Sequence, residues 1–290
     1  MRRFPFRSVE PTFFAGLLDD PVLYVRVRPQ DSAFLFDCGQ IHHLAKRVLR
    51  SVTHLFISHA HMDHFMGMDT FIRNNHVSSR TVDIYGPPGI AGKTACKLAA
   101  FDWNLAEPSW CTFRVHEIHS DRTAIFILPG AEGFPCRLAD EQPRRNRIIH
   151  QRGHLMVEAE LCDHMIPSVI YRVTEPPPFE IDQRKLDQAG LIRGEWLRLL
   201  EKLFRQGFAE SVPVPVLRRE EENVEMQEIQ DAQGLYDAIR TDHPAAAIGY
   251  ISDIGFSDKN KEKVTSLMAG VTLLVCECSF LAAHRDKARI

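Results

Sequence analysis

The segment from His54 to Asp69 reads HLFISHAHMDHFMGMD. Its apolar run LFIS predicts a buried β-strand, and a dense polar pattern, H-x-H-x-D-H, follows this strand directly. A single histidine after a strand is usually structural, whereas this pattern offers several metal-binding side chains on one short loop. The predicted metal ligands in this loop are His59, His61, Asp63 and His64.

The spacing of these side chains indicates two metal sites rather than one. His59 and His61 are two residues apart, so in extended backbone they can point to the same side and share one metal. Asp63 and His64, at the start of a following helix, can reach a second metal. Imidazole and carboxylate ligands together suit zinc, with manganese or iron as alternatives. Two ions about 3.5–4 Å apart would activate water and polarise a scissile bond.

Length and composition indicate a globular chain without a general affinity for polyanions. The chain has 290 residues, of which 44% are hydrophobic and 25% charged, and its net charge is -3. Seven widely spread cysteines fit reduced thiols better than a disulfide framework. The first residues, MRRFPFRSVEPTFF, lack the apolar core of a signal peptide, and no run approaches the length of a membrane helix. We therefore expect a cytoplasmic protein with no membrane partner.

The pattern along the chain predicts an α/β fold. Short β-rich runs occur at 22–28, 33–37, 54–58, 82–85, 124–128, 155–161, 169–173, 246–252 and 272–277. Helical patterns occur at 88–101, 184–206, 258–268 and 280–289. Proline, glycine and charge predict loops at 129–146 and 174–180, and the charge run at 218–228 indicates a solvated helix face or loop.

The loop motif resembles the signature of the metallo-β-lactamase fold hydrolases, and four further segments resemble this family in order. LFDCG (35–39) resembles the motif whose Asp, here Asp37, supports the metal loop by hydrogen bonding. AELCDHMIPSVIYRV (159–173) is similar to the ribonuclease Z form of the third motif, which makes His164 a ligand of the first metal. GYISDIGFSD (249–258) resembles the motif whose Asp, here Asp253, bridges both metals. LLVCECSFL (273–281) resembles the ribonuclease Z His-Glu-Ala-Thr segment, with Cys276 in place of the His and Glu277 at the Glu.

The residues alone leave alternatives open at these outlying positions. His154 competes with His164 as a ligand, and Asp37 and Asp253 could each be a turn or capping residue. Glu277 could be a buried ion-pair partner instead of a catalytic group.

The resemblance implies an αββα sandwich, in which two mixed β-sheets are flanked by helices, as a single domain over residues 1–290. It further implies an inserted helical arm at about 175–210, which in ribonuclease Z grips transfer RNA. Six basic residues against four acidic ones give 182–205 a net charge of +2, which is weak support for a phosphate-binding surface. Glu195 stands where the family's arm has a proline, so specificity for transfer RNA stays open.

The implied function is metal-dependent hydrolysis of phosphodiester bonds, with RNA or a small phosphodiester as substrate. Asp63 would position the nucleophile and accept its proton, and Glu277 would assist catalysis. Alternatives are a cyclic-phosphodiester, thioester or lactone hydrolase of the same fold, or a non-catalytic member that binds RNA or protein. The protein could also assemble as a homodimer.

The family closes its second metal site with a further His beyond the Glu-containing motif, where this sequence offers only His284. That position matches no family ligand, so we expect a missing C-terminal segment after residue 290. Without it, the second metal would bind more weakly than the first.

Overall fold

The computed structural model describes residues 6–14, 19–28, 32–152, 155–175, 178–208, 210–220, 223–242 and 245–277. The chain divides into two compact units. The first contains residues 1–149, 157–173 and 247–290, and the second contains 150–156 and 174–246.

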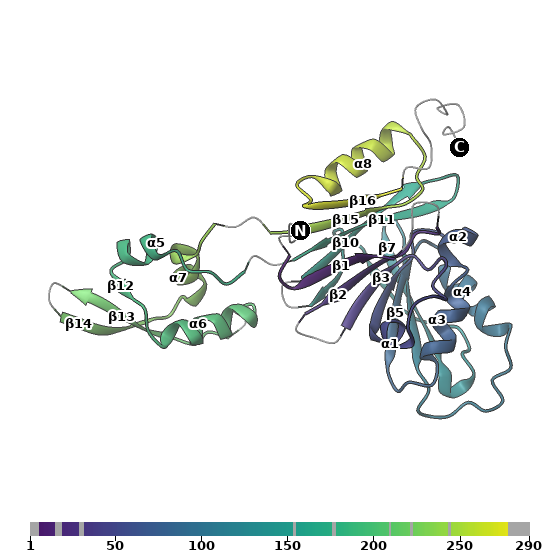
Figure 1. Ribbon diagram of the computed structural model, residues 1–290, viewed down its shortest axis with the longest axis horizontal. Coiled ribbons are helices and arrows are strands. Elements are labelled where there is room, and N and C mark those ends of the chain that lie inside the picture. Colours follow the sequence, from purple (N-terminus) through teal and green to yellow (C-terminus); the bar gives the residue numbers. More distant parts are fainter. Residues whose placement is uncertain are drawn as a thin grey trace. The chain divides into compact units, whose positions relative to one another are not determined.

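An eight-stranded sheet follows the chain order from β1 to β8 (Figure 1). Parallel pairing joins β3 to β6 through β4 and β5, and the strands outside this block pair antiparallel. The sheet is therefore mixed. Its strands are β1 (Val9–Phe13), β2 (Leu23–Val27), β3 (Ser32–Phe36), β4 (Val52–Phe56), β5 (Thr81–Gly86), β6 (Thr112–Ile118), β7 (Arg122–Pro129) and β8 (Arg137–Pro143).

A second, five-stranded sheet has the order β16-β15-β11-β10-β9. Its strands are β9 (Ile148–Arg152), β10 (Leu155–Asp163), β11 (Pro167–Thr174), β15 (Ala247–Ile251) and β16 (Leu273–Cys276). β15 and β16 pair in parallel although the helix α8 (Asp258–Met268) separates them in the sequence. This is the β-α-β crossover expected between parallel neighbours.

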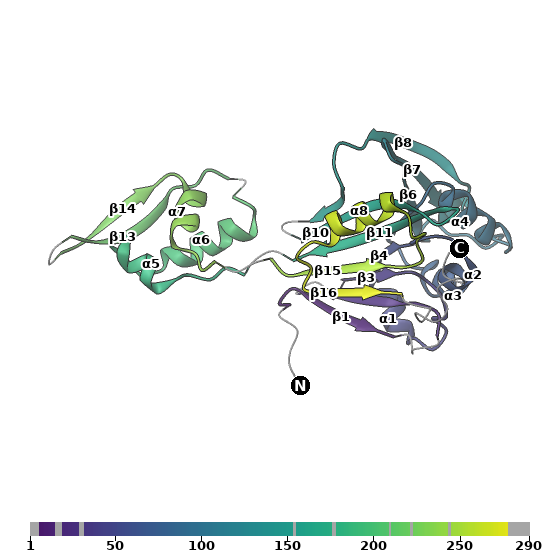
Figure 2. The ribbon, with the colours of Figure 1, turned by 90° about the horizontal axis from the view of Figure 1, so that it is seen from above.

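Aromatic side chains fill the space between the two sheets. Phe36 stacks on Phe56 with ring centroids 4.8 Å apart, and Tyr171 of the second sheet meets both rings edge-on. Helices cover the outer faces: α8 packs against the five-stranded sheet, and helices that follow β3 to β5 pack against the eight-stranded one (Figures 1 and 2). The helices on the eight-stranded sheet are α1 (Lys46–Ser51), α2 (Met62–Phe65), α3 (Met68–Asn75) and α4 (Ile90–Ala99), with a 3-10 turn η1 at Gly130–Glu132. The predicted αββα sandwich of two mixed sheets is confirmed.

The second unit has its own hydrophobic core. Helices α5 (Gln183–Gln188), α6 (Trp196–Arg205) and α7 (Ala232–Ile239) enclose this core together with a small sheet, β12 (Leu191–Ile192), β13 (Val214–Glu220) and β14 (Asn223–Ile229). Asp182 and Asp231 cap the first turns of α5 and α7 through their carboxylates. The range 175–210, expected as a helical arm, contains α5 and α6, but the unit extends to residue 246 and includes strands.

Two of the expected loops are strands. Residues 137–143 form β8, the last strand in the order of the eight-stranded sheet, and all seven are exposed. Residues 218–220 lie in β13 and residues 223–228 in β14, and the two strands pair antiparallel from Val214↔Ile229 onward. β8 and β14 are exposed edge strands, which need no apolar alternation, so their charged residues gave no strand pattern in the sequence. The predicted helix at 280–289 lies outside the described residues.

Among the described residues, no helix is both long and apolar enough to cross a membrane. The expectation of a cytoplasmic location stays a prediction.

Candidate metal centre

Two hydrogen bonds to the backbone of Ile57 hold the chain directly after β4, just before the polar cluster begins. Ile57 donates its N–H to the carbonyl of Tyr85 on β5, and the buried hydroxyl of Tyr171 donates to the carbonyl of Ile57 at 2.7 Å. The chain then leaves the sheet, and α2 begins at Met62. The sequence therefore places the polar pattern at the carboxyl end of a central parallel strand, where ligand sites of α/β sheets form.

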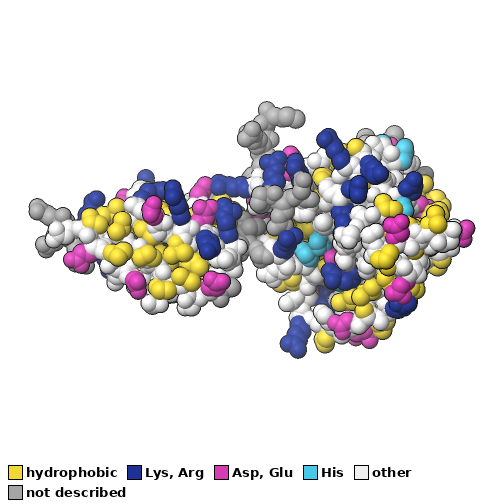
Figure 3. Space-filling view, turned by 90° about the horizontal axis from the view of Figure 1, so that it is seen from below, with side chains coloured by type: hydrophobic (Ala, Val, Ile, Leu, Met, Phe, Trp, Pro, Cys, Tyr) yellow, Lys and Arg dark blue, Asp and Glu magenta, His cyan; other side chains and the backbone are white. Residues whose placement is uncertain are grey.

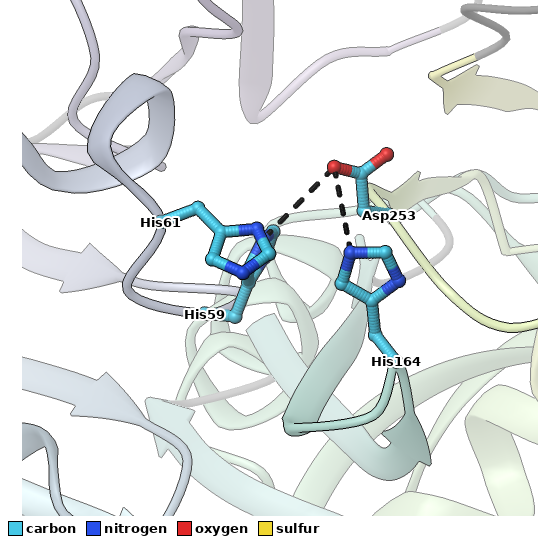
Figure 4. Close-up of side chains that lie close together, drawn as sticks. All are labelled: His59, His61, His164 and Asp253. Carbon is cyan, nitrogen blue, oxygen red and sulfur yellow. Dashed lines mark hydrogen bonds and ion pairs between the residues drawn. The ribbon is translucent and has the colours of Figure 1, made fainter. Parts of the chain in front are cut away.

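One group of four side chains converges at this edge (Figure 4). His59 and His61 come from the loop, with His59 Nε2 2.9 Å from His61 Nδ1. His164, from the turn between β10 and β11, and Asp253, from the segment after β15, complete the group. Asp253 Oδ2 lies 4.0 Å from His59 Nε2 and 3.9 Å from His164 Nε2. One potential ligand atom from each residue lies within 4.8 Å of the others.

A second group shares Asp253 with the first. His64 Nε2 lies 3.2 Å from Asp63 Oδ2 and 3.7 Å from Asp253 Oδ2. His64 is fully buried, whereas the Asp63 carboxylate is half exposed. The structure therefore brings together the six residues predicted as metal ligands, in two sets joined by one carboxylate: His59, His61, Asp63, His64, His164 and Asp253.

Asp37 is the buried centre that orients this loop. Its Oδ1 accepts the backbone N–H of Ser58 at 2.7 Å, and its Oδ2 accepts the hydroxyls of Ser58 and Tyr250. Oδ2 also accepts Nδ1–H of His64 at 2.9 Å. Asp37 directly follows β3 and has a left-handed φ of 55°, which Asp adopts more readily than most residues because its short polar side chain can hydrogen-bond locally.

Electrostatics at the cluster favour a cation. Burial would lower the pKa of His64, but the carboxylates of Asp253, Asp37 and Asp63 raise it to about 10. Burial and the neighbouring His64 instead lower the pKa of His59 to about 4, which keeps that imidazole neutral. The neighbouring His64, 3.7 Å away, and the nearby His164 and His59 hold the pKa of Asp253 below its usual range, although burial opposes this. Neutral imidazole and ionised carboxylate are the forms that bind metals. His59 and Asp253 are therefore already in that form, whereas His64 would release a proton when a cation takes the place of its positive charge.

The donor set fits a pair of divalent cations. His64 donates from Nδ1 to Asp37, so its buried Nε2 is the atom that faces Asp63 and Asp253, and Nε2 has no hydrogen-bond partner among the described residues. A carboxylate–histidine pair of this kind orients metal-bound imidazoles in proteins generally. His59, His61, His164 and Asp253 would hold one ion, and Asp63, His64 and Asp253 the other.

The remaining predicted residues lie at different places. Glu277 Oε2 is 3.9 Å from His64 Nε2, so this carboxylate borders the second group. Cys276 is exposed, and its Sγ lies 3.4 Å from the carbonyl of Glu277. His154 and His284 lie outside the described residues.

Sequence reasoning missed the residues that brace Asp37. Tyr250 donates its hydroxyl to Asp37 at 2.8 Å from 213 positions away, and the Ser252 Oγ lies 3.3 Å from His64 Nδ1. The only available signal was that a buried tyrosine hydroxyl needs a partner. Nothing in the sequence identified which partner.

Comparison with known proteins agrees with this geometry. Residues 32–154 match the model of the β-lactamase superfamily domain. The matched segment carries β3, β4 and the whole H-x-H-x-D-H loop. The similarity and the donor groups agree that the chain is a metal-dependent hydrolase.

Over most of its length the chain is similar to proteins named ribonuclease Z. The chain is 27% identical over 257 residues to a ribonuclease Z of Deinococcus radiodurans, which covers 88% of this chain and 73% of the relative. It is 24% identical over 271 residues to a ribonuclease Z of Prochlorococcus marinus strain MIT 9313, covering 91% and 70%. A crystal structure of human tRNase Z, short form, aligns at 17% identity over 57% of this chain and 64% of that one, with a TM-score of 0.34 that is too low to support an argument.

Proposed function

We propose that this protein is a ribonuclease Z-like endonuclease that hydrolyses phosphodiester bonds in RNA and uses two zinc ions. The observation that carries the proposal is the pair of donor groups joined by Asp253. A phosphodiester transition state places negative charge on oxygens that two adjacent cations can neutralise together. The similarity to two ribonucleases Z over about nine-tenths of the chain supports RNA as the substrate.

When bound, the metal pair supplies Lewis acidity and lowers the pKa of water. The residues of the chain orient the metal-binding groups. Asp37 fixes the ring of His64 through Nδ1, and the loop backbone is held by the N–H of Ser58 on the same carboxylate. The geometry of the donors is thereby set before any substrate binds, which reduces reorganisation during the reaction.

Asp63 would accept the proton of the nucleophile. Its Oδ2 faces His64 Nε2 at 3.2 Å, and its side chain is 47% exposed, so the carboxylate borders both the donor group and the solvent. In this position Asp63 orients the attacking water and accepts its proton. Glu277, 24% exposed and 3.9 Å from His64, would assist by orienting the substrate side of the same site.

The second unit is proposed as the arm that holds RNA. Its helices α5 and α6 occupy the range of the predicted arm. Lys185 pairs with Asp242 and Arg205 with Glu201, so part of the basic charge is neutralised within the unit. The remaining basic side chains on these helices, Arg184, Arg198 and Lys202, would contact phosphates.

A substrate screen tests the function. The zinc-loaded protein is incubated with a transfer RNA that carries a 3′ extension, a chromogenic phosphodiester, a thioester and a lactone. We expect cleavage of the RNA and of the phosphodiester only, and loss of both in a His59→Ala/His61→Ala variant. Preferential turnover of the thioester or lactone would indicate a small-molecule hydrolase, and inactivity on all four substrates would indicate a non-catalytic binding protein.

A further inference from the structure

A groove of about 980 Å³ lies in the first unit and shares no lining residue with the metal centre. Its floor consists of side chains of β1 and β2, which stand on the sheet face that α1 covers only in part, and α1 forms its wall. Figure 2 shows β1 and α1 beside each other at the margin of this unit. The lining residues are Glu10, Thr12, Tyr24, Arg26, Ser32, Lys46, Arg47, Val48, Arg50 and Ser51.

The groove is strongly basic. Four of its lining residues are Lys or Arg and one is acidic, and that acid, Glu10, already pairs with Arg28 outside the groove. Lys46, Arg47 and Arg50 are exposed, and none of them has an ion-pair partner among the described residues. Figure 3 shows Lys and Arg side chains on the underside of the first unit.

Concentrating three cations on α1 opposes its stability. The six-residue helix KRVLRS contains no acidic residue, and Lys46 and Arg50 are four positions apart, so they repel one another across one turn. Two other lysines of this unit are neutralised locally: Lys97 pairs with Asp69 at 3.0 Å and Lys261 with Asp258 at 2.9 Å. A bound polyanion would remove the repulsion on α1.

The other lining groups suit phosphate and sugar oxygens. Tyr24, Thr12, Ser32 and Ser51 bring hydroxyls to the groove, and Tyr24 and Ser51 are joined at 2.9 Å, which anchors α1 to the floor. Basic side chains and hydroxyls together make most protein contacts to nucleic-acid backbones.

The groove begins near the metal edge of the sheet. Where β1 pairs with β2, the last pair is Phe13 with Leu23, and Thr12 with Tyr24 stands next to it. The pair Glu10 with Arg26 lies about 7 Å further from that end of the sheet. Beyond that end, Asp20 packs against Gly39 next to the backbone of Asp63. An RNA strand whose scissile bond lies at the metal centre would therefore reach the groove by continuing along this face of the sheet.

We propose that this groove binds the phosphate backbone of the RNA substrate at nucleotides away from the cleavage point, a proposal that rests on the proposed function. Lys46, Arg47 and Arg50 provide the cations, and the groove anchors RNA on the catalytic unit independently of the second unit. It recognises backbone and not base sequence.

The test compares Lys46→Ala/Arg47→Ala/Arg50→Ala with a matched control, Arg73→Ala/Arg145→Ala/Lys259→Ala. The control removes three exposed basic residues of the same unit that lie outside the groove and have no ion-pair partner among the described residues. Binding of the extended transfer RNA is measured by fluorescence anisotropy from about 50 to 200 mM salt, with Asp63→Ala added to each variant to prevent cleavage. Thermal unfolding checks that α1 remains folded.

For the groove variant we expect affinity about 10-fold to 100-fold weaker and a salt slope reduced by about two to three, because each lost phosphate contact contributes about 0.7 to 0.9 to that slope. The control should bind like the parent. Equal losses in both variants would show a general charge effect and overturn the proposal, as would unchanged RNA affinity. A loss seen with inorganic tripolyphosphate but not with RNA would assign the groove to a small polyanion and also overturn it.

Cleavage of the chromogenic phosphodiester, measured with Asp63 present, separates the two proposals. The groove variant should retain this cleavage. If the parent protein cleaves neither this substrate nor RNA but still loses RNA affinity on substitution of the groove, the proposed function fails and the groove stands.

Discussion

His64 Nδ1 and Asp37 Oδ2 are 2.9 Å apart, and both side chains are fully buried. This contact keeps a proton on Nδ1 of His64 and directs Nε2 toward Asp63 and Asp253. The donor geometry of the second group therefore depends on a residue that would itself bind no metal.

Replacing Asp37 with Asn should weaken metal binding at the second group. An amide cannot match the charge of the carboxylate that orients and polarises the imidazole, and loss of such partners typically costs about 10-fold to 100-fold in affinity. Zinc titration by calorimetry measures the effect. Asp83→Asn is the matched control, because Asp83 is also a buried carboxylate bonded to a histidine but lies outside both donor groups. Unchanged zinc affinity in Asp37→Asn would contradict the role of Asp37.

The two donor groups should differ in affinity for zinc. The first offers three imidazoles and a carboxylate, whereas the second offers Asp63, His64 and the shared Asp253. We expect purified protein to contain zinc by elemental analysis and a titration with a tight first step and a weaker second one. Less than about a tenth of an equivalent, without uptake on reconstitution, would reject the metal centre altogether.

Asp63→Ala should reduce phosphodiester hydrolysis by more than about a hundredfold, because proton transfer by a positioned group contributes about 10² to 10⁴ in rate. The variant also loses a donor of the second group. Steady-state kinetics on the chromogenic substrate measures the loss. Asp69→Ala is the control, since Asp69 pairs with Lys97 outside the donor groups. A folded Asp63→Ala protein with near-normal turnover would disprove the assignment.

Asp83 should make stability depend on acid pH. Burial would raise its pKa, but hydrogen bonds from His116 at 2.7 Å and from Arg114 hold the pKa below its usual range. Because the folded pKa is lowered, this contribution is complete above the unfolded pKa of about 3.9 and is lost as pH falls below it. Asp83→Asn should therefore cost roughly 1.5–3 kcal/mol at pH 7 and progressively less below pH about 4. Denaturant unfolding across this pH range checks the trend, and a constant difference would contradict it.

The sequence predicts those parts of the site that are local. His59 to His64 lie within six residues after an apolar strand, so their chemistry is visible in one short segment. His164 and Asp253 lie about 100 and 190 residues further along the chain, and only the order of family motifs connected them to that loop. The Asp37–Tyr250 bond is a contact between two sheets, and no local pattern specifies it.

The missed strands have a different cause. β13 begins with buried Val214 and Val216, but its second half and all of β14 up to Glu228 are exposed or partly exposed and rich in charge. Periodicity reports burial on one face, and these strands bury little. The single predicted helix at 184–206 is broken for a local reason: Gly190, with φ 69°, ends α5 and leads into β12.

Removing the second unit should separate RNA binding from chemistry. Deleting only 180–208 would cut through the core that joins Leu186 and Leu200 to Tyr236, so the whole insertion is the better target. Glu175 donates its N–H to the carbonyl of Ala246 at 2.8 Å, so a short Gly-Ser linker can replace residues 176–245 between backbones that are already adjacent. We expect affinity for the extended transfer RNA to fall by at least about tenfold, as a large part of the phosphate contacts is lost. Cleavage of the chromogenic phosphodiester and zinc content should stay near those of the parent, because both donor groups lie in the first unit. Equal losses on RNA and on the small substrate would instead show that the second unit supports the fold or the chemistry of the catalytic unit.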